Sequence, residues 1–113
     1  MNSLYIYKFT PNRVVDGDTL VGSLDMGMRI YMNTHIRLWG INTAELHSKD
    51  EDQRAKAKDA KKFVEDNVTL GQQYVFESKE MDAFGRALGI LYISNEITLN
   101  QLLLDKKLAV IYK

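Results

Sequence analysis

Three short segments of the chain combine residue types that could do chemistry. In the first, Asp16 and Asp18 flank Gly17 between two apolar stretches that are expected to form strands. Asp and Gly are common turn residues for backbone reasons, so this segment taken alone favours a tight turn. Its two carboxylates still make it a candidate functional segment.

The second segment, residues 37–45, has the sequence R-L-W-G-I-N-T-A-E. A strand is expected to end here and to present Asn42, Thr43 and Glu45 in quick succession. Oxygen donors at such spacing suit a hard cation such as Ca²⁺, which takes carboxylate, amide and backbone carbonyl oxygens. The alternative interpretation is a solvated strand end that carries one arginine.

Arginines accompany these oxygen donors. In a regular strand, Arg37 and Trp39 share one face, and Trp39 in the middle of a strand is expected to belong to the core. The third segment, residues 82–88, places Arg86 directly after Gly85 at the start of another strand. Considered alone, this segment predicts a hairpin loop with a surface charge.

The elements that must position these residues begin with strands. Apolar and β-branched residues predict strands at residues 4–7, 14–15, 19–24 and 28–41, with a break at Pro11-Asn12 and a turn at residues 25–27. Consecutive strands joined by short turns predict an antiparallel meander.

The middle of the chain changes to a helical pattern. Ser48, followed three residues later by Glu51, fits a capping box, and good helix formers extend from residue 50 to about 70. Gly71 stands where a C-cap glycine is expected. The predicted buried face consists of apolar residues at helical spacing: Ala57, Ala60, Phe63, Val64 and Val68.

The rest of the chain predicts strands at residues 73–79 and 87–93, and a short helix at residues 99–106 that buries Leu99, Leu102 and Leu103. The apolar tail, residues 108–112, should pack or pair. This order predicts a mainly β protein with helices (α+β): a five-stranded OB-fold-type barrel with one long and one short helix. We expect residues 1–113 to form a single domain.

Composition excludes several kinds of site. The chain has no Cys, which excludes a disulfide framework, a zinc-thiolate centre and a cysteine nucleophile. Its 15 basic and 15 acidic residues give a net charge of +0, so contact with phosphates must come from a local patch. No apolar run approaches the roughly 20 residues of a membrane span. We therefore expect a cytoplasmic or intracellular protein, unless a signal peptide was removed.

Taken together, the three segments resemble the staphylococcal nuclease (thermonuclease) family. The D-G-D-T element matches at residues 16–19, the R-L-x-G-I-x-T-x-E stretch at residues 37–45, and an aromatic-G-R-x-L element at residues 84–88. Asn100, Leu103, Leu108-Ala109 and Tyr112 continue the likeness, which spans roughly residues 14–112. The first two elements in tandem are quite specific, whereas the third is weak by itself.

The resemblance implies a Ca²⁺-dependent nuclease, an endonuclease-type hydrolase, that acts on DNA or RNA and prefers single strands; another divalent cation could replace Ca²⁺. It assigns metal ligation to Asp18, Asn42 and the Thr43 carbonyl, an outer-shell place to Asp16, the general base to Glu45, and phosphate binding to Arg37 and Arg86. Phe84 and Tyr112 are the candidate substrate contacts, and Tyr92 is a weaker one.

The chain departs from the family pattern at several positions. Asn42 replaces an aspartate ligand, Ala44 replaces a proline, and Ala83 and Phe84 stand where a lysine and a tyrosine touch phosphate. The alternative is therefore a catalytically weak or inactive OB-fold nucleic-acid-binding module; a partner-binding barrel is a third interpretation. A glutamate beside two arginines favours the enzyme, because a binding module does not need that glutamate near phosphate.

Two further motifs carry less weight. The lysines of the long predicted helix alternate with acidic residues and predict a solvated face. Glu77-Ser78-Lys79 resembles the E-x-K element of another nuclease class, but three residues match easily by chance.

Overall fold

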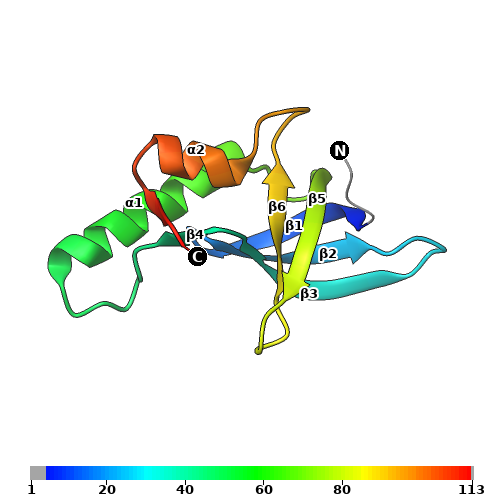
Figure 1. Cartoon of the computed structure of the whole chain (residues 1–113), viewed down its shortest axis with the longest axis horizontal. Helices are drawn as coiled ribbons and strands as arrows, with labels where there is room; N and C mark the ends of the chain where they lie inside the picture. Colours follow the sequence, from blue (N-terminus) through cyan, green and yellow to red (C-terminus); the bar gives the residue numbers. More distant parts are fainter. Residues whose placement is uncertain (1–4, 113) are drawn as a thin grey trace.

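A computed structural model describes residues 5–112 and shows a closed five-stranded barrel with two helices (Figure 1). The elements are β1 (Ile6–Asp16), β2 (Thr19–Asp25), β3 (Tyr31–Leu38), β4 (Ile41–Thr43), α1 (Glu51–Asn67), β5 (Tyr74–Met81), β6 (Ala87–Tyr92), α2 (Leu99–Asp105) and β7 (Ala109–Ile111). The barrel order is β1-β2-β3-β6-β5, and β4 pairs with β7 in a separate two-stranded sheet. The predicted α+β, OB-type architecture is confirmed.

The barrel is not antiparallel throughout. β1, β2 and β3 form the predicted meander, and β5 pairs antiparallel with both β6 and β1. β3 and β6, however, run parallel, with Arg37 opposite Leu88. Because this pair joins strands separated by β4, α1 and β5, a prediction based on neighbouring hairpins missed it.

Large apolar side chains fill the barrel. Phe9 and Phe76 are fully buried, and their ring centroids lie 6.3 Å apart. Gly22 and Gly89 face these rings: a Cβ on Gly22 would lie 2.8 Å from the Phe9 ring, and one on Gly89 would lie 2.5 Å from the Phe76 ring. Close packing therefore requires a glycine opposite each aromatic ring.

Two predicted strand boundaries were wrong. β1 continues through Pro11 and Asn12, where the register with β2 shifts as a bulge and the Pro11 carbonyl accepts a hydrogen bond from Gly71 N (2.9 Å). The predicted strand at residues 28–41 is shorter, because β3 ends at Leu38 and the chain turns through Gly40 (φ +80°). Residue 4, at the start of the first predicted strand, lies outside the described residues.

The helix α1 begins one residue after its predicted start and ends a few residues before its predicted end. Its N-cap is Asp50, whose side chain accepts a hydrogen bond from Asp52 N (2.9 Å), so the predicted Ser48 capping box is wrong. Ser48 Oγ instead accepts a hydrogen bond from Asp50 N (3.2 Å). Val68, not Gly71, is the C-cap. The predicted apolar face is nevertheless buried except at Phe63, which is half-buried, and α1 packs against β1.

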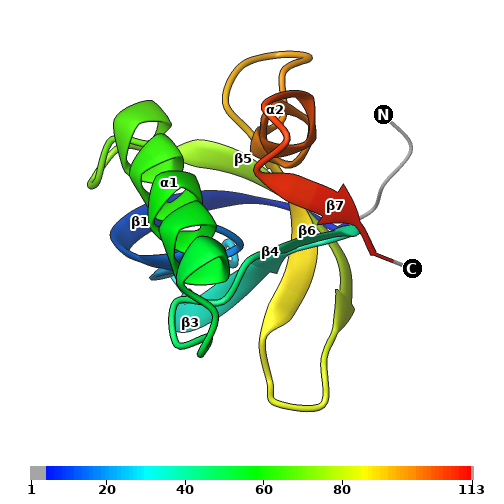
Figure 2. The ribbon, with the colours of Figure 1, turned by 90° about the vertical axis from the view of Figure 1, so that its left-hand side faces the viewer.

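The second helix leads the chain back to β4. Thr98 caps α2 by accepting a hydrogen bond from Gln101 N (3.1 Å), and Leu99 and Leu103 are buried while Leu102 is half-buried. β7 then pairs with β4, which confirms that the tail pairs (Figure 2).

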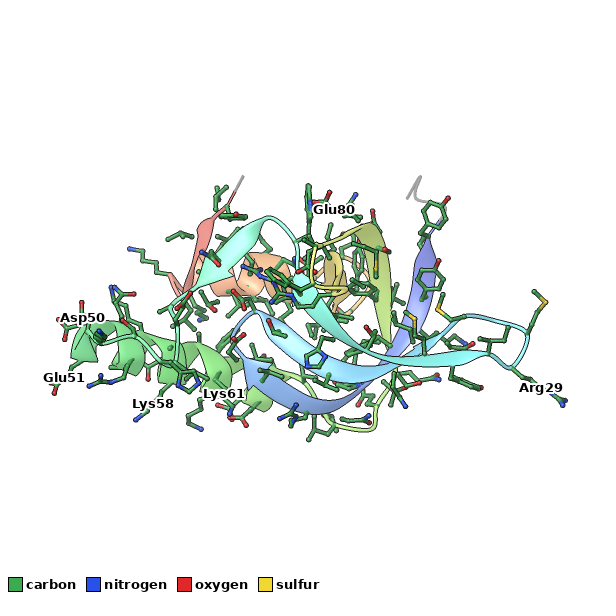
Figure 3. All side chains as sticks on the ribbon, turned by 90° about the horizontal axis from the view of Figure 1, so that it is seen from below. Arg29, Asp50, Glu51, Lys58, Lys61 and Glu80 are labelled. Atoms are coloured by element: carbon green, nitrogen blue, oxygen red, sulfur yellow. The ribbon has the colours of Figure 1, made fainter. Side chains whose placement is uncertain are left out.

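The molecule is elongated, with extents of 46 × 28 × 25 Å. Arg29 at the tip of the β2–β3 hairpin lies at one end, and Asp50 and Glu51 at the start of α1 lie at the other (Figure 3). No helix among the described residues is long and apolar enough to cross a membrane.

Candidate active site

A pocket of about 390 Å³ lies where the β1–β2 turn, the end of β3, the segment around β4 and the start of β6 meet. All the residues that sequence reasoning assigned to metal ligation or catalysis line it. The lining consists of Val15, Asp16, Asp18, Arg37, Asn42, Thr43, Ala44, Glu45, Leu46, His47 and Arg86. The fold therefore brings together three segments that lie far apart in the sequence.

The β1–β2 turn positions its two aspartates by close contact with neighbouring elements. A Cβ on Gly17 would lie 2.6 Å from Ala60 of α1 and 3.0 Å from Thr43, so only glycine allows this approach. The Asp18 carbonyl accepts a hydrogen bond from Leu38 N (2.9 Å), and Asp18 Oδ2 accepts one from Thr43 N (3.1 Å). Asp18 is consequently buried and held against both β3 and β4.

Arg37 is held by oxygen acceptors on several sides. Its Nη1 donates to the carbonyls of Leu38 (3.0 Å) and Ile41 (3.1 Å). Its Nη2 donates to Asn42 Oδ1 (2.6 Å) and lies 3.3 Å from Asp18 Oδ2. These contacts fix the guanidinium group at the pocket and leave its Nε–H for another acceptor.

The two aspartates form an interacting acid pair. Burial, together with the hydrogen bond to Asp18 and the charge of Asp18, raises the pKa of Asp16 to about 6. Burial alone would raise the pKa of Asp18 as well, but the hydrogen bond from Asp16, the charge of Arg37 and the Thr43 N–H outweigh it and lower that pKa. The pKa values of the two neighbouring carboxyl groups are therefore shifted in opposite directions, as expected when two like charges share a partly buried site.

Arg86 is oriented by Asp82, a residue that sequence reasoning did not single out. Arg86 Nε lies 2.6 Å from Asp82 Oδ2, and Asp82 Oδ1 accepts hydrogen bonds from Phe84 N and Arg86 N, each at 2.9 Å. Burial alone would raise the pKa of Asp82, but these bonds to Arg86 and Phe84 lower it. An aspartate at the start of a Gly-containing loop was the available sequence signal for this turn.

A groove of about 970 Å³ adjoins the pocket and shares Arg37, Asn42 and Arg86 with it. The predicted substrate contacts Phe84 and Tyr112 both line the groove. So does Trp39, which is 43% exposed; its prediction as a core residue was wrong. The full lining is Arg37, Leu38, Trp39, Gly40, Asn42, Glu80, Met81, Asp82, Phe84, Arg86, Leu88, Ile111 and Tyr112.

Two other groups lie apart from the groove. The Tyr92 hydroxyl donates to Glu77 Oε1 (2.8 Å), and Tyr92 does not line the groove, so its place as a substrate contact is not supported. Lys58 and Lys61 project from α1 on the opposite side of the molecule from Glu80 (Figure 3). His47, in contrast, lines the pocket beyond Glu45.

The donor set fits a hard divalent cation. Within residues 5–112, no three His, Cys, Asp or Glu side chains cluster to hold a metal by themselves. The pocket instead offers the Asp18 carboxylate, the Asn42 amide oxygen and the Thr43 segment, all of them oxygen donors of the kind that Ca²⁺ takes. The Asn42 oxygen accepts from Arg37 with one lone pair and keeps a second for a cation.

The protein is a closed OB-type barrel with a pocket on its side. This pocket combines two carboxylates with two guanidinium groups, an arrangement typical of domains suited to binding a phosphate and a cation. Comparison with protein families matches residues 35–113 to the staphylococcal nuclease homologue family. The match covers more than half of the chain, and the chain belongs to this family, as the sequence predicted.

The family match includes Arg37, Glu45 and Arg86 but begins after Asp16 and Asp18. The structure connects the β1–β2 turn to the matched region, because Asp18 contacts both Arg37 and Thr43. No functionally curated protein matches the chain. The family and the barrel together support a nuclease-type or nucleic-acid-binding domain.

Proposed function

We propose that this protein is a Ca²⁺-dependent nuclease that hydrolyses phosphodiester bonds in single-stranded DNA or RNA. The observation that carries the proposal is the convergence of the Asp16–Asp18 pair, Glu45, Arg37 and Arg86 on one open pocket. A phosphodiester is an anion that repels a hydroxide nucleophile, so positive groups on either side of it lower the barrier to attack.

The two arginines bind and neutralise the phosphate. A guanidinium group remains charged at any physiological pH. Arg37 offers its Nε–H and Arg86 its two Nη groups, because the contacts described above engage the other nitrogens. Arg37 is held by backbone carbonyls and Arg86 by Asp82, so neither has to reorganise as charge grows on the phosphoryl oxygens. This preorganisation is what electrostatic stabilisation of a transition state requires.

Glu45 is the proposed general base. It follows β4, is exposed, and lines the pocket with both arginines. A carboxylate in this position orients a water molecule toward the phosphorus atom and accepts its proton.

Asp18, Asn42 and the Thr43 carbonyl would hold the cation, with Asp16 in the outer shell. A bound divalent cation neutralises phosphate charge and lowers the pKa of a coordinated water molecule. The close approach of two carboxylates beside a backbone carbonyl and an amide oxygen supports this assignment, because Ca²⁺ takes oxygen ligands of these kinds.

The first test is the variant Glu45→Gln, assayed on a single-stranded oligonucleotide with Ca²⁺ and with a chelator. We expect Ca²⁺-dependent cleavage by the wild type and cleavage at least about a hundredfold slower in the variant, because the proton acceptor is lost. His35→Ala, an exposed change on β3 outside the pocket, is the control and should cleave normally. Equal rates in Glu45→Gln and wild type would refute the role of Glu45.

A nucleic-acid-binding module without catalysis is the second candidate. Asn42 favours it, because a neutral amide replaces a charged ligand and its oxygen already binds Arg37 Nη2 (2.6 Å). Binding of the oligonucleotide by the wild type without cleavage at any Ca²⁺ concentration would support this alternative.

A further inference from the structure

Trp39 is held in place at the wall of the groove. It is the chain's single tryptophan and lies in the turn between β3 and β4. Its backbone N–H donates to the Gly89 carbonyl (2.7 Å), and its carbonyl accepts from Nδ2 of the buried Asn100 (2.9 Å). β6 and α2 therefore fix the backbone from which the indole ring projects.

A charged network contacts one face of the ring. Lys79 Nζ lies 5.5 Å from the centroid of the Trp39 ring and 2.7 Å from Glu77 Oε2. Glu77 is only 6% exposed and also accepts a hydrogen bond from the Tyr92 hydroxyl (2.8 Å). Contacts thus run from Tyr92 to Glu77, from Glu77 to Lys79, and from Lys79 to Trp39. The two central residues belong to the Glu77-Ser78-Lys79 motif.

The strand geometry aims the lysine at the ring. The register between β5 and β6 shifts between Ser78 and Glu80, which leaves Lys79 as the extra residue of a β-bulge. Bulges commonly redirect a side chain in this way. Trp39 lines the groove and Lys79 does not, so the ring face not covered by the lysine is the one available to a ligand in the groove.

We propose that Trp39 is a base-stacking platform that receives an unpaired nucleobase next to the bound phosphate, and that Lys79 and Glu77 are positioning residues for it. The proposal rests on the proposed function, since it concerns the same substrate. The groove shares Arg37, Asn42 and Arg86 with the pocket, so a strand whose phosphate lies between the arginines continues past Trp39, Phe84 and Tyr112.

The chemistry of the groove selects single strands. Aromatic rings stack on any base that is not already stacked or paired, so the contact tolerates sequence but requires an unpaired base. The groove volume of about 970 Å³ lies within the range that accommodates a ligand of nucleotide size.

Fluorescence provides a direct readout, because Trp39 is the single tryptophan. The Glu45→Gln protein, in Ca²⁺, is titrated with single-stranded oligothymidylate, with an abasic oligomer of the same length, and with a duplex. We expect oligothymidylate to quench the emission strongly. The abasic oligomer, which has the same phosphates without bases, and the duplex should quench it weakly.

Affinity for labelled oligomers, measured by anisotropy in the same Glu45→Gln background, tests the residues. Trp39→Ala should weaken binding of oligothymidylate about five- to hundredfold and leave binding of the abasic oligomer unchanged. Trp39→Phe should restore most of the affinity. Lys79→Met should reduce the preference for the base-bearing oligomer, and Lys79→Arg should restore it. Tyr31→Ala, which removes an exposed aromatic ring outside the groove, is the matched control.

The outcomes separate the two proposals. Unchanged affinity for oligothymidylate in Trp39→Ala would overturn the platform, and so would an equal loss for both oligomers that Trp39→Phe does not rescue. If the unsubstituted wild type neither binds nor cleaves any oligomer, the proposed function itself fails. If the wild type cleaves but the protein binds oligothymidylate and the abasic oligomer equally well, the stacking platform is contradicted and the proposed function is not.

Discussion

At the scale of single residues, Asn42 is the position from which we expect the largest effect on the affinity of the proposed cation site. Its amide oxygen accepts from Arg37 Nη2 at 2.6 Å, and Asp18 Oδ2 lies 3.3 Å from the same nitrogen. The two proposed ligands, one neutral and one charged, therefore contact the same guanidinium group. Cation affinity at such sites depends on the number of charged ligands, so a neutral side chain here predicts weak binding.

Asn42→Asp should consequently tighten Ca²⁺ binding, on the order of tenfold, because it adds a carboxylate to the ligand set. Calorimetric titration of wild type and variant with Ca²⁺ measures the change. Asn33→Asp makes the same chemical change at an exposed position of β3 outside the pocket and should leave the affinity unaltered. Unchanged or weaker binding in Asn42→Asp would count against the proposed ligand set.

Glu77 gives the fold a pH-dependent contribution. Hydrogen bonds from Lys79 and Tyr92 lower its pKa below the ordinary value of 4.5, although burial opposes them. A carboxyl group with a lowered folded-state pKa stabilises the protein above the unfolded-chain pKa, and that stability is lost as the pH falls through the folded-state value.

We therefore expect Glu77→Gln to reduce the free energy of unfolding by about 1–2 kcal/mol at pH 7, and the difference from wild type to shrink as the pH falls toward 3. Urea unfolding at a series of pH values measures both effects. Glu96→Gln, at an exposed position, should show little difference at any pH. If the difference in the free energy of unfolding between wild type and Glu77→Gln stays constant with pH, the charge of Glu77 does not account for the stabilisation.

At the scale of elements, the end of α2 determines how the chain reaches β7. Leu108 N donates to the Leu103 carbonyl (2.9 Å) and Lys107 N to the Leu104 carbonyl (3.0 Å), which is the Schellman pattern. Lys107 occupies the left-handed position of this motif with φ +61°. A side chain is strained in that conformation, whereas glycine is not.

Lys107→Gly should therefore raise the free energy of unfolding by about 0.5–1 kcal/mol. The increase is expected because the strain energy removed from the folded state exceeds the stability lost to the greater entropy of the unfolded chain. Thermal or urea unfolding tests this expectation. Lys107→Ala keeps a Cβ at the same φ and should change stability little. Destabilisation by glycine would indicate that the lysine side chain contributes more than its backbone conformation costs.

Element boundaries were predictable where local chemistry acts alone. Ala57, Ala60 and Val64 repeat at helical spacing, and the structure buries them. The helix caps were predicted less accurately. Ser48 and Asp50 are both residue types that favour the N-cap, and only the hydrogen bonds seen in the structure show which of them caps the helix. The end of β3 was missed because its apolar pattern continues through residues 39–41, although Gly40 marks the turn.

At the scale of the whole molecule, barrel closure is what creates the site. The Asp16–Asp18 turn, the segment from Arg37 to Glu45, and Arg86 approach one another because β2, β3 and β6 are neighbours in the barrel. The parallel pairing of β3 with β6 brings the Arg86 end of β6 beside Arg37. The β4–β7 pair then extends the site into a groove by carrying Ile111 and Tyr112 to its wall.

The sequence by itself determined the family, the fold class and the polar and charged residues proposed for metal ligation and catalysis, because motif spacing and hydrophobic periodicity are local properties of the chain. The tertiary structure decided what depends on contacts between distant segments. These are the parallel β3–β6 pairing, the ion pair of Arg86 with Asp82, the opposite pKa shifts of Asp16 and Asp18, and the exposure of Trp39 beside Lys79. Burial, charge pairing and ring contacts depend on which residues are neighbours in space. The spacing of residues along the sequence does not specify those neighbours.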